Sequence, residues 1–218
     1  VGALDVAPVV YLDDADRGAA CAEALVLADL LADGLGLPVF LYGALGGGRT
    51  RAQLRRGGPT ELARRMQAGE LVPDFGPARL HRTAGAVLVA ARPPLIAFNV
   101  QLAPPARLED AQRIAALIRE GGAEGRPGLR AIGLWLEQAG IAQVSTNIED
   151  HRATSPAEVV AAVAGHAPVA DAELVGLAPE AALAQLPANV MLRGRATIEE
   201  ALDGWRRRID THEGAPTS

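Results

Sequence analysis

Neutral polar side chains occupy one side of two predicted strands, residues 95–102 and 141–148. Strand residues alternate between faces, so Asn99 and Gln101 lie opposite the apolar residues of the first strand. The corresponding positions of the second strand are Gln143, Ser145 and Asn147. Amides donate and accept hydrogen bonds, which suits a heterocyclic ligand with amide-like edges better than a charged one. The pattern alone favours the alternative, a solvated sheet face, although exposed faces in this chain usually carry charge.

A long segment with few apolar anchors, residues 73–85, is a second candidate for chemistry. Loops of this length in a compact domain are often binding loops, although linkers share the pattern. Arg79 and Arg82 within it, and Arg92 beyond it, could each hold a carboxylate with two hydrogen bonds. His81 lies in the same loop. Single arginines and histidines are more often simply surface residues.

Several other chemistries are excluded or disfavoured. All 21 basic residues are arginine, so a Schiff-base lysine and a P-loop lysine are both excluded. The glycine-rich stretch 43–50 is therefore predicted to be a flexible connector rather than a phosphate cradle. Cys21 is predicted to be a small buried hydrophobe. The histidines match no metal-ligand spacing: they are His81, His151, His166 and His212.

The first half of the chain alternates strand and helix patterns. Residues 1–12 form a β-rich run and residues 37–42 a short buried strand, while residues 50–56 and a segment from Pro59 are predicted to be short helices. Between the two strands, apolar residues recur every three or four positions, which predicts an amphipathic helix. Its apolar stripe comprises Cys21, Ala24, Ala28, Leu31 and Leu35. Its predicted capping residues are Asp13, Asp14 and Asp16.

The proline pair Pro93-Pro94 separates two predicted strands and predicts a subdomain boundary. The strands expected around and beyond it are 85–91, 95–102, 129–136, 141–148 and 169–177. The expected helices are 111–118, one starting at the capping box Ser155-Pro156-Ala157-Glu158, 179–186, and a polar helix from Ala196. This alternation predicts an α/β fold of the α+β type, in two layers.

Composition narrows the class of protein further. A chain of 218 residues that is 49% hydrophobic and 22% charged can bury a substantial core. The net charge of −5 disfavours a nucleic-acid partner, and no apolar run is long enough to span a membrane. A single cysteine and the absence of a basic-then-apolar opening suit a cytoplasmic protein.

A set of short motifs, in a particular order and spacing, resembles the glutamate formimidoyltransferases. The motifs are Pro73-Asp74-Phe75-Gly76-Pro77, Gly85, Ala91-Arg92, Leu95-Ile96-Ala97-Phe98-Asn99, Gln143-Val144-Ser145-Thr146-Asn147 and Val175-Gly176-Leu177. The stretches Val1–Val6 and Leu37–Gly43 fit as well, so the resemblance covers about residues 1–185.

The resemblance implies a fold and a reaction. It implies two α/β subdomains, each a mixed sheet with helices packed on it, with a ligand cleft between them. Residues 1–92 would form part of the first subdomain, 93–190 the second, and 191–218 a polar tail. The reaction would move the formimino group of N-formimino-L-glutamate to tetrahydrofolate, in histidine degradation. Tetrahydrofolate would be a co-substrate, and no metal is implied.

The resemblance also assigns binding residues. The folate-binding segment would comprise Gly76, Pro77, Ala78, Arg79, Leu80, His81, Arg82, Thr83, Ala84 and Gly85. The cleft would also be lined by Arg92, Asn99, Gln143, Ser145 and Asn147. Because the backbone of Gly76 and Gly85 would approach the ligand closely, valine at either position is expected to weaken folate binding more than folding.

The general base of the family lies in a His-Pro-Arg-x-Gly motif, of which Val1-Gly2 would be the last two residues. The base is therefore expected upstream of Val1, and this chain alone is expected to be inactive. The alternatives are a non-catalytic folate-binding or interaction protein, and a relative that transfers formyl groups. Exposed sheet edges would favour pairing, for example as a homodimer.

Overall fold

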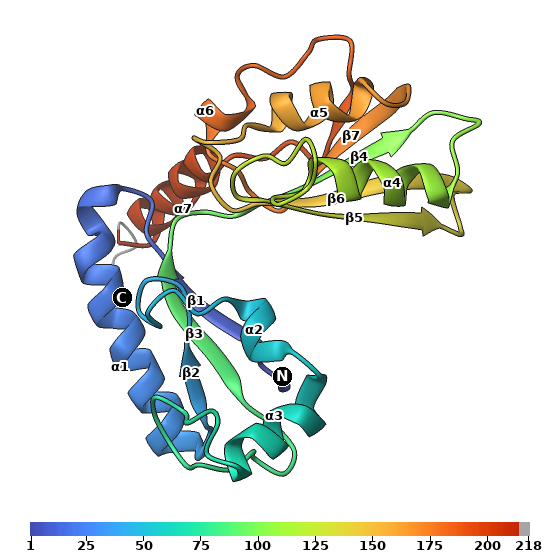
Figure 1. The fold of residues 1–218 in the computed structure, drawn as a ribbon. Coiled ribbons are helices and arrows are strands. Elements are labelled where there is room, and N and C mark those ends of the chain that lie inside the picture. The colour runs from blue at the N-terminus through green and yellow to red at the C-terminus, as the bar shows by residue number, and fades with distance from the viewer. Residues whose placement is uncertain (214–218) are drawn as a thin grey trace. The chain divides into compact units, whose positions relative to one another are not determined.

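The computed structural model describes residues 1–213 and divides the chain into two units, one on each side of the Pro93–Pro94 bond. Each unit is a β-sheet with helices packed on it (Figure 1), which confirms the expected α/β class. In the part of the chain that is described, no helix is long and apolar enough to cross a membrane.

The first unit contains a three-stranded parallel sheet in the order β1-β3-β2. Its strands are β1 (Val6–Val10), β2 (Val39–Leu41) and β3 (Val87–Arg92). The central strand β3 is an almost continuous apolar run, as expected of a parallel strand that is covered on both faces. Isolated antiparallel bridges make the sheet mixed: Gly2 with Gly85, and Val39 with Phe75.

Helices cover both faces of this sheet. Val87 and Val89 of β3 pack with α1 (Arg17–Leu35), whereas Leu88 and Ala90 pack with α2 (Arg51–Arg55) and α3 (Gly58–Gln67). Figure 1 shows α1 on one side of the sheet and α2 and α3 on the other. The expectation of two layers is therefore wrong for this unit, which has three, because β3 buries both of its faces.

The buried stripe of α1 differs from the expected one. The residues that face the sheet are Ala20, Ala24, Ala28 and Ala32. Cys21 is only half-buried, contrary to the prediction, and Leu35 is 59% exposed. Small side chains let the helix lie close to the sheet, so alanine rather than leucine occupies the contact. Asp13 caps the 3₁₀ turn η1 (Asp14–Asp16) before the helix by accepting from the Ala15 amide at 2.9 Å.

The second unit contains a five-stranded mixed sheet in the order β5-β6-β4-β7-β8. The strands are β4 (Ile96–Leu102), β5 (Leu129–Leu136), β6 (Ile141–Ile148), β7 (Val169–Val175) and β8 (Leu192–Arg193). All neighbours are antiparallel except β7 and β8, which are parallel. The two-residue strand β8 was not predicted, because so short a strand has no readable periodicity.

The helices α4 (Leu108–Ile118), α5 (Pro156–Ala164) and α6 (Glu180–Leu183) pack on one face of this sheet. Their core contact is made by the apolar side of β4 with residues such as Ile114 and Val159. The predicted capping box of α5 is confirmed, since Ser155 and Glu158 each accept from the other's amide. The polar helix α7 (Ile198–Glu213) follows, and residues 214–218 of the expected tail lie outside the described range.

Candidate functional site

A cavity of about 590 Å³ lies in the first unit, at the amino ends of β1 and β3. Cavities of this size are typical of small-molecule sites. Six of its lining residues belong to the segment that sequence analysis identified as a binding loop. The lining comprises Val1, Gly2, Ala3, Pro59, Leu80, His81, Arg82, Thr83, Ala84 and Gly85.

The backbone of the loop closes on itself before β3. The His81 amide donates to the Gly85 carbonyl at 2.9 Å, and the Gly85 amide donates to the His81 carbonyl at 3.0 Å. The Ala3 amide donates to the Ala84 carbonyl at 3.0 Å, which fastens the loop to the segment that precedes β1. The wall of the cavity therefore has a defined backbone conformation.

The His81 ring forms part of the same turn. Its Nδ1 accepts the backbone amide of Ala84 at 3.1 Å and that of Thr83 at 3.3 Å. A nitrogen that accepts hydrogen bonds carries no proton, so the neutral ring has its proton on Nε2. No sequence pattern indicates this orientation, which depends on the turn formed by the residues that follow His81.

Gly76 and Gly85 are glycines because the chain packs tightly around them. Gly76 has φ +79°, and an added Cβ would lie 2.2 Å from the Leu37 carbonyl oxygen. Gly85 has φ +72°, and its Cβ would lie 2.4 Å from the Val1 carbonyl oxygen. The expectation that valine at these positions would affect folding less than folate binding is therefore wrong, because both glycines are required by the fold. The approach of a ligand to their backbone stays a prediction.

Asp74 anchors the start of the loop, a role that sequence analysis missed. Its carboxylate accepts from the Leu41 amide at 2.8 Å and from Arg49 Nη2 at 2.6 and 2.7 Å. Arg49 closes the glycine-rich stretch after β2, since its carbonyl accepts from the Gly43 amide at 2.9 Å. That stretch is a hydrogen-bonded turn tied to the Pro73–Pro77 motif. The sequence did contain a signal for this role, because Asp74 is the only charged residue of that motif.

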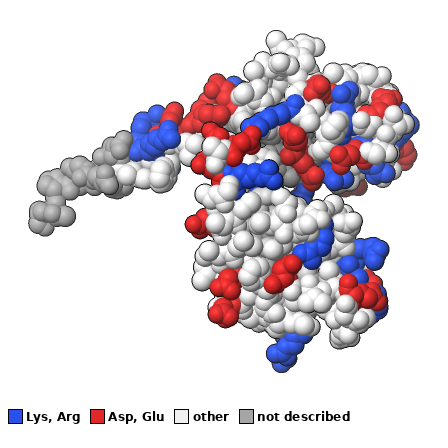
Figure 2. Space-filling model, turned by 60° about the vertical axis from the view of Figure 1, so that its left-hand side comes forward, with Lys and Arg blue, Asp and Glu red and all other residues white. Residues whose placement is uncertain are grey.

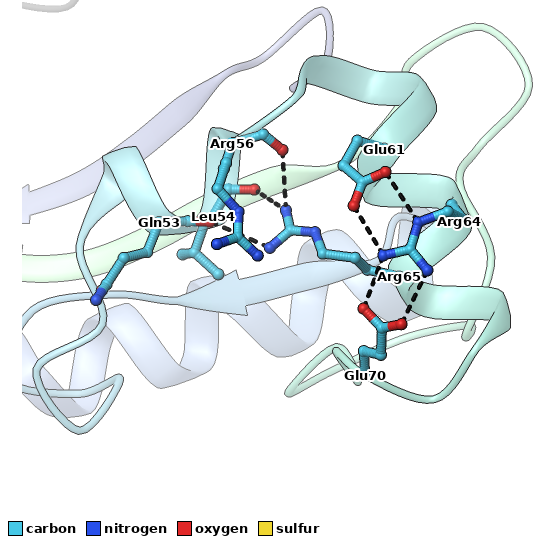
Figure 3. A network of polar contacts seen from close by, with 7 residues as sticks. All are labelled: Gln53, Leu54, Arg56, Glu61, Arg64, Arg65 and Glu70. Atoms are coloured by element: carbon cyan, nitrogen blue, oxygen red, sulfur yellow. Dashed lines mark hydrogen bonds and ion pairs between the residues drawn. The ribbon is translucent and has the colours of Figure 1, made fainter.

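Arg65 joins α3 to α2. Its helix, α3, also contains Pro59, one of the residues that line the cavity. Its guanidinium is buried and donates to the last carbonyls of α2 (Figure 3). These carbonyls are those of Gln53 at 3.1 Å, Leu54 at 2.6 Å and Arg56 at 3.4 Å. Carbonyls at a helix end have no partner within the helix, so Arg65 supplies the missing donors.

Arg64, the neighbour of Arg65, points to the surface and pairs with two carboxylates (Figure 3). It donates to Glu61 and to Glu70, with contacts of 2.8–2.9 Å. These hydrogen bonds lower the pKa of both carboxyl groups. The network links α3 to Glu70, which lies in the turn directly after this helix.

The amide-bearing strands are arranged as predicted. Asn99 pairs with Ser145, and Gln101 with Gln143, and side chains of paired residues in adjacent strands project to the same side. Asn147 shares this face through its pairing with Ala97, while the apolar side of β4 is fully buried. The prediction that Asn99, Gln143, Ser145 and Asn147 share one side of the sheet is confirmed.

Charged groups extend this face, which the sequence did not indicate. Glu173 pairs with Asn99 in the sheet and accepts from its Nδ2 at 3.0 Å. Arg193 Nε donates to Asp171 Oδ1 at 3.2 Å. We refer to Asn99, Gln101, Gln143, Ser145, Asn147, Asp171, Glu173 and Arg193 as the polar sheet face. On the molecular face drawn in Figure 2, acidic and basic side chains are interspersed.

The predicted arginines are not gathered at one place, although Arg82 lines the cavity. Arg79 and Arg82 are exposed, and Arg92 donates from Nη1 to the Pro93 carbonyl at 3.1 Å. The loop residues belong to the first unit, and the polar sheet face belongs to the second. Within residues 1–213, no group of three or more His, Cys, Asp or Glu side chains is placed to hold a metal ion.

Two α/β units follow one another in this chain, and the first contains the cavity. Two family models match the chain: the N-terminal subdomain of the formiminotransferase domain over residues 1–92, and the formiminotransferase domain over residues 97–201. The chain belongs to the formiminotransferase family.

Curated relatives carry the corresponding names. The formimidoyltransferase-cyclodeaminase of Gallus gallus is 37% identical over 196 residues, which is 84% of this chain and 36% of the relative. The glutamate formimidoyltransferase of Streptococcus pyogenes serotype M1 is 33% identical over 191 residues, 84% of this chain and 63% of the relative. The glutamate formimidoyltransferase of Thermoplasma acidophilum is 31% identical over 193 residues, which is 84% of this chain and 62% of the relative. The chain thus spans about a third to under two thirds of these relatives.

Proposed function

We propose that this chain takes part in transfer of the formimino group from N-formimino-L-glutamate to tetrahydrofolate, the reaction of histidine degradation. The family and the names of its relatives support a formimidoyltransferase. The observation that carries the proposal is the cavity itself, because residues 80–85 line it and belong to the segment that the resemblance assigns to folate. Tetrahydrofolate acts as co-substrate, and both substrates are small molecules.

In this proposal the loop Gly76–Gly85 is the folate-binding segment, and its backbone and His81 side chain form the wall against the ligand. Arg92, Asn99, Gln143, Ser145 and Asn147 provide further polar contacts to the substrates. The subdomains correspond to residues 1–92 and 93–190, followed by the tail 191–218.

The transfer requires a proton acceptor. A nitrogen of tetrahydrofolate attacks the formimino carbon and loses its proton, the bond from that carbon to the glutamate nitrogen breaks, and glutamate leaves after gaining a proton. A positioned base typically contributes ~10²–10⁴-fold to such a step. The resemblance gives this role to the histidine of a His-Pro-Arg-x-Gly motif, and none of the four histidines of residues 1–218 stands in that motif.

His81, the histidine that lines the cavity, is poorly suited to replace that base. His81 uses Nδ1 as a backbone acceptor, which leaves only a protonated Nε2 in the neutral ring. Burial lowers the pKa of His151, which lies in the second unit. His166, also in the second unit, contacts Glu124 at 2.9 Å through Nε2. We therefore propose that residues 1–218 bind the substrates but turn them over slowly.

The test is a transfer assay with N-formimino-L-glutamate and tetrahydrofolate. The chain is assayed beside a version that carries the family motif directly before Val1, and the extended version is expected to be faster by ~10²–10⁴-fold. N-formyl-L-glutamate as the donor provides the control, and a preference for it would favour formyl transfer instead. Equal turnover by the two versions would place the base within residues 1–218 and contradict the proposal.

A further inference from the structure

Backbone hydrogen bonds hold the ring of His81, one of the residues that line the cavity, in one orientation. Its Nδ1 accepts the amides of Thr83 and Ala84, as an Asn or Asp side chain does in an Asx turn. The ring of the neutral histidine therefore has one N–H, at Nε2, and no free acceptor. This half-buried side chain lines the cavity.

The other polar side chains of the cavity are also donors or carry positive charge. Arg82 and Thr83 line it together with His81. The rest of the described lining is small or apolar, including Pro59 and Leu80, and contains no aspartate or glutamate. A surface that offers a guanidinium, an imidazole N–H and a hydroxyl, without a carboxylate of its own, is complementary to an anionic oxygen ligand.

We propose that His81 and Arg82 bind a carboxylate of a glutamyl group at this cavity. The inference rests on the proposed function, in which both substrates carry such a group: the tail of tetrahydrofolate and the body of N-formimino-L-glutamate. His81 donates from Nε2 to one carboxylate oxygen, and Arg82 supplies the positive charge. Arg82 is exposed and His81 is half-buried, so we expect the hydrogen bond from His81 to be the less screened of the two contacts.

The turn suggests substitutions that separate binding from folding. In His81→Asn, the side-chain oxygen can still accept the Thr83 and Ala84 amides, but the shorter side chain no longer places a donor at the position of Nε2. His81→Asp keeps the same acceptors and brings a negative charge toward the ligand. Both variants are expected to keep the melting temperature of the wild type, whereas His81→Ala loses the turn. His166→Asn, at a half-buried histidine of the second unit, is the matched control.

The experiment measures binding by calorimetry with three probes: tetrahydrofolate, its analogue with both glutamyl carboxylates converted to amides, and N-formimino-L-glutamate. Loss of a hydrogen bond to a charged group should weaken binding by ~10-fold or more. If folate supplies the carboxylate, His81→Asn loses affinity for tetrahydrofolate but not for the diamide. If the donor substrate supplies it, only N-formimino-L-glutamate binding is weakened. His81→Asp should weaken binding of the same probe further, and His166→Asn should leave the binding of all three probes unchanged.

The inference is overturned if His81→Asn binds all probes as the wild type does, or if it loses equal affinity for tetrahydrofolate and for the diamide. A folded wild-type protein that binds neither tetrahydrofolate nor N-formimino-L-glutamate would instead contradict the proposed function itself.

Discussion

Individual residues of the loop are required by the fold, and Gly76 is the clearest example. Its positive φ and the Leu37 carbonyl, 2.2 Å from the position of a Cβ, are independent of any ligand. We predict that Gly76→Ala lowers the free energy of unfolding by about 2–4 kcal/mol. Gly34 provides a matched control, because it lies in α1 with open space around it. Gly34→Ala should raise the free energy of unfolding by roughly 0.5–1 kcal/mol. Urea unfolding measures both variants, and equal changes in the free energy of unfolding would show that the fold does not require glycine at position 76.

The ion pairs of Arg64 predict a pH dependence of stability. Hydrogen bonds from Arg64 lower the pKa of Glu61 and Glu70 from 4.5 in the folded state. Groups whose folded pKa is depressed stabilise the protein above the unfolded pKa, and the contribution is lost as pH falls through the folded pKa. The wild type should therefore lose more stability than Arg64→Met below pH ~4.5. Melting temperatures at pH 7 and pH 3.5 test this, and parallel curves would refute it.

Residue-scale features were the least predictable from the sequence. The histidine of the loop was identified, but its orientation depends on hydrogen bonds from Thr83 and Ala84 that no spacing reveals. Asp171 and Glu173 alternate along a predicted strand, yet only the pairing of Asn99 with Glu173 shows that they extend the amide-bearing face.

At the scale of elements, Arg65 is the main polar support of the α2–α3 pair. Replacement by methionine leaves the buried carbonyls at the end of α2 without donors and should cost about 2–4 kcal/mol of unfolding free energy. The adjacent exposed Arg64 is the matched control, and Arg64→Met at pH 7 should cost much less, because water screens exposed ion pairs. Chemical denaturation of both variants measures the difference. Equal losses would show that the contacts to Gln53, Leu54 and Arg56 contribute little.

Elements with strong local patterns were predicted closely. The strands Leu129–Leu136 and Ile141–Ile148 match the expected bounds, because Gly140 marks the connection between them. The capping box at Ser155 correctly predicted the start of α5. The buried face of α1 was misplaced because leucine outweighs alanine in a hydrophobic pattern, whereas close packing on the sheet selects alanine. The two layers expected for the first unit became three, because helix contacts on both faces of β3 depend on tertiary structure.

At the scale of the whole molecule, each of the two units contributes a different set of predicted binding groups. The first has a cavity walled by residues 80–85, and the second has the polar sheet face on β4, β6, β7 and β8. Family membership connects both units with one transfer reaction, whose assignment to this chain remains the proposal argued above.

The central claim, that the loop Gly76–Gly85 holds the folate, is tested most directly by hydrogen exchange of the backbone amides with and without tetrahydrofolate. The account predicts that bound tetrahydrofolate slows exchange in peptides spanning residues 76–85 and the first residues of the chain, which share the cavity wall. His166→Asn should show the same pattern, and His81→Asn should need more ligand to reach it. Protection by saturating tetrahydrofolate that leaves residues 76–85 unchanged would contradict the claim.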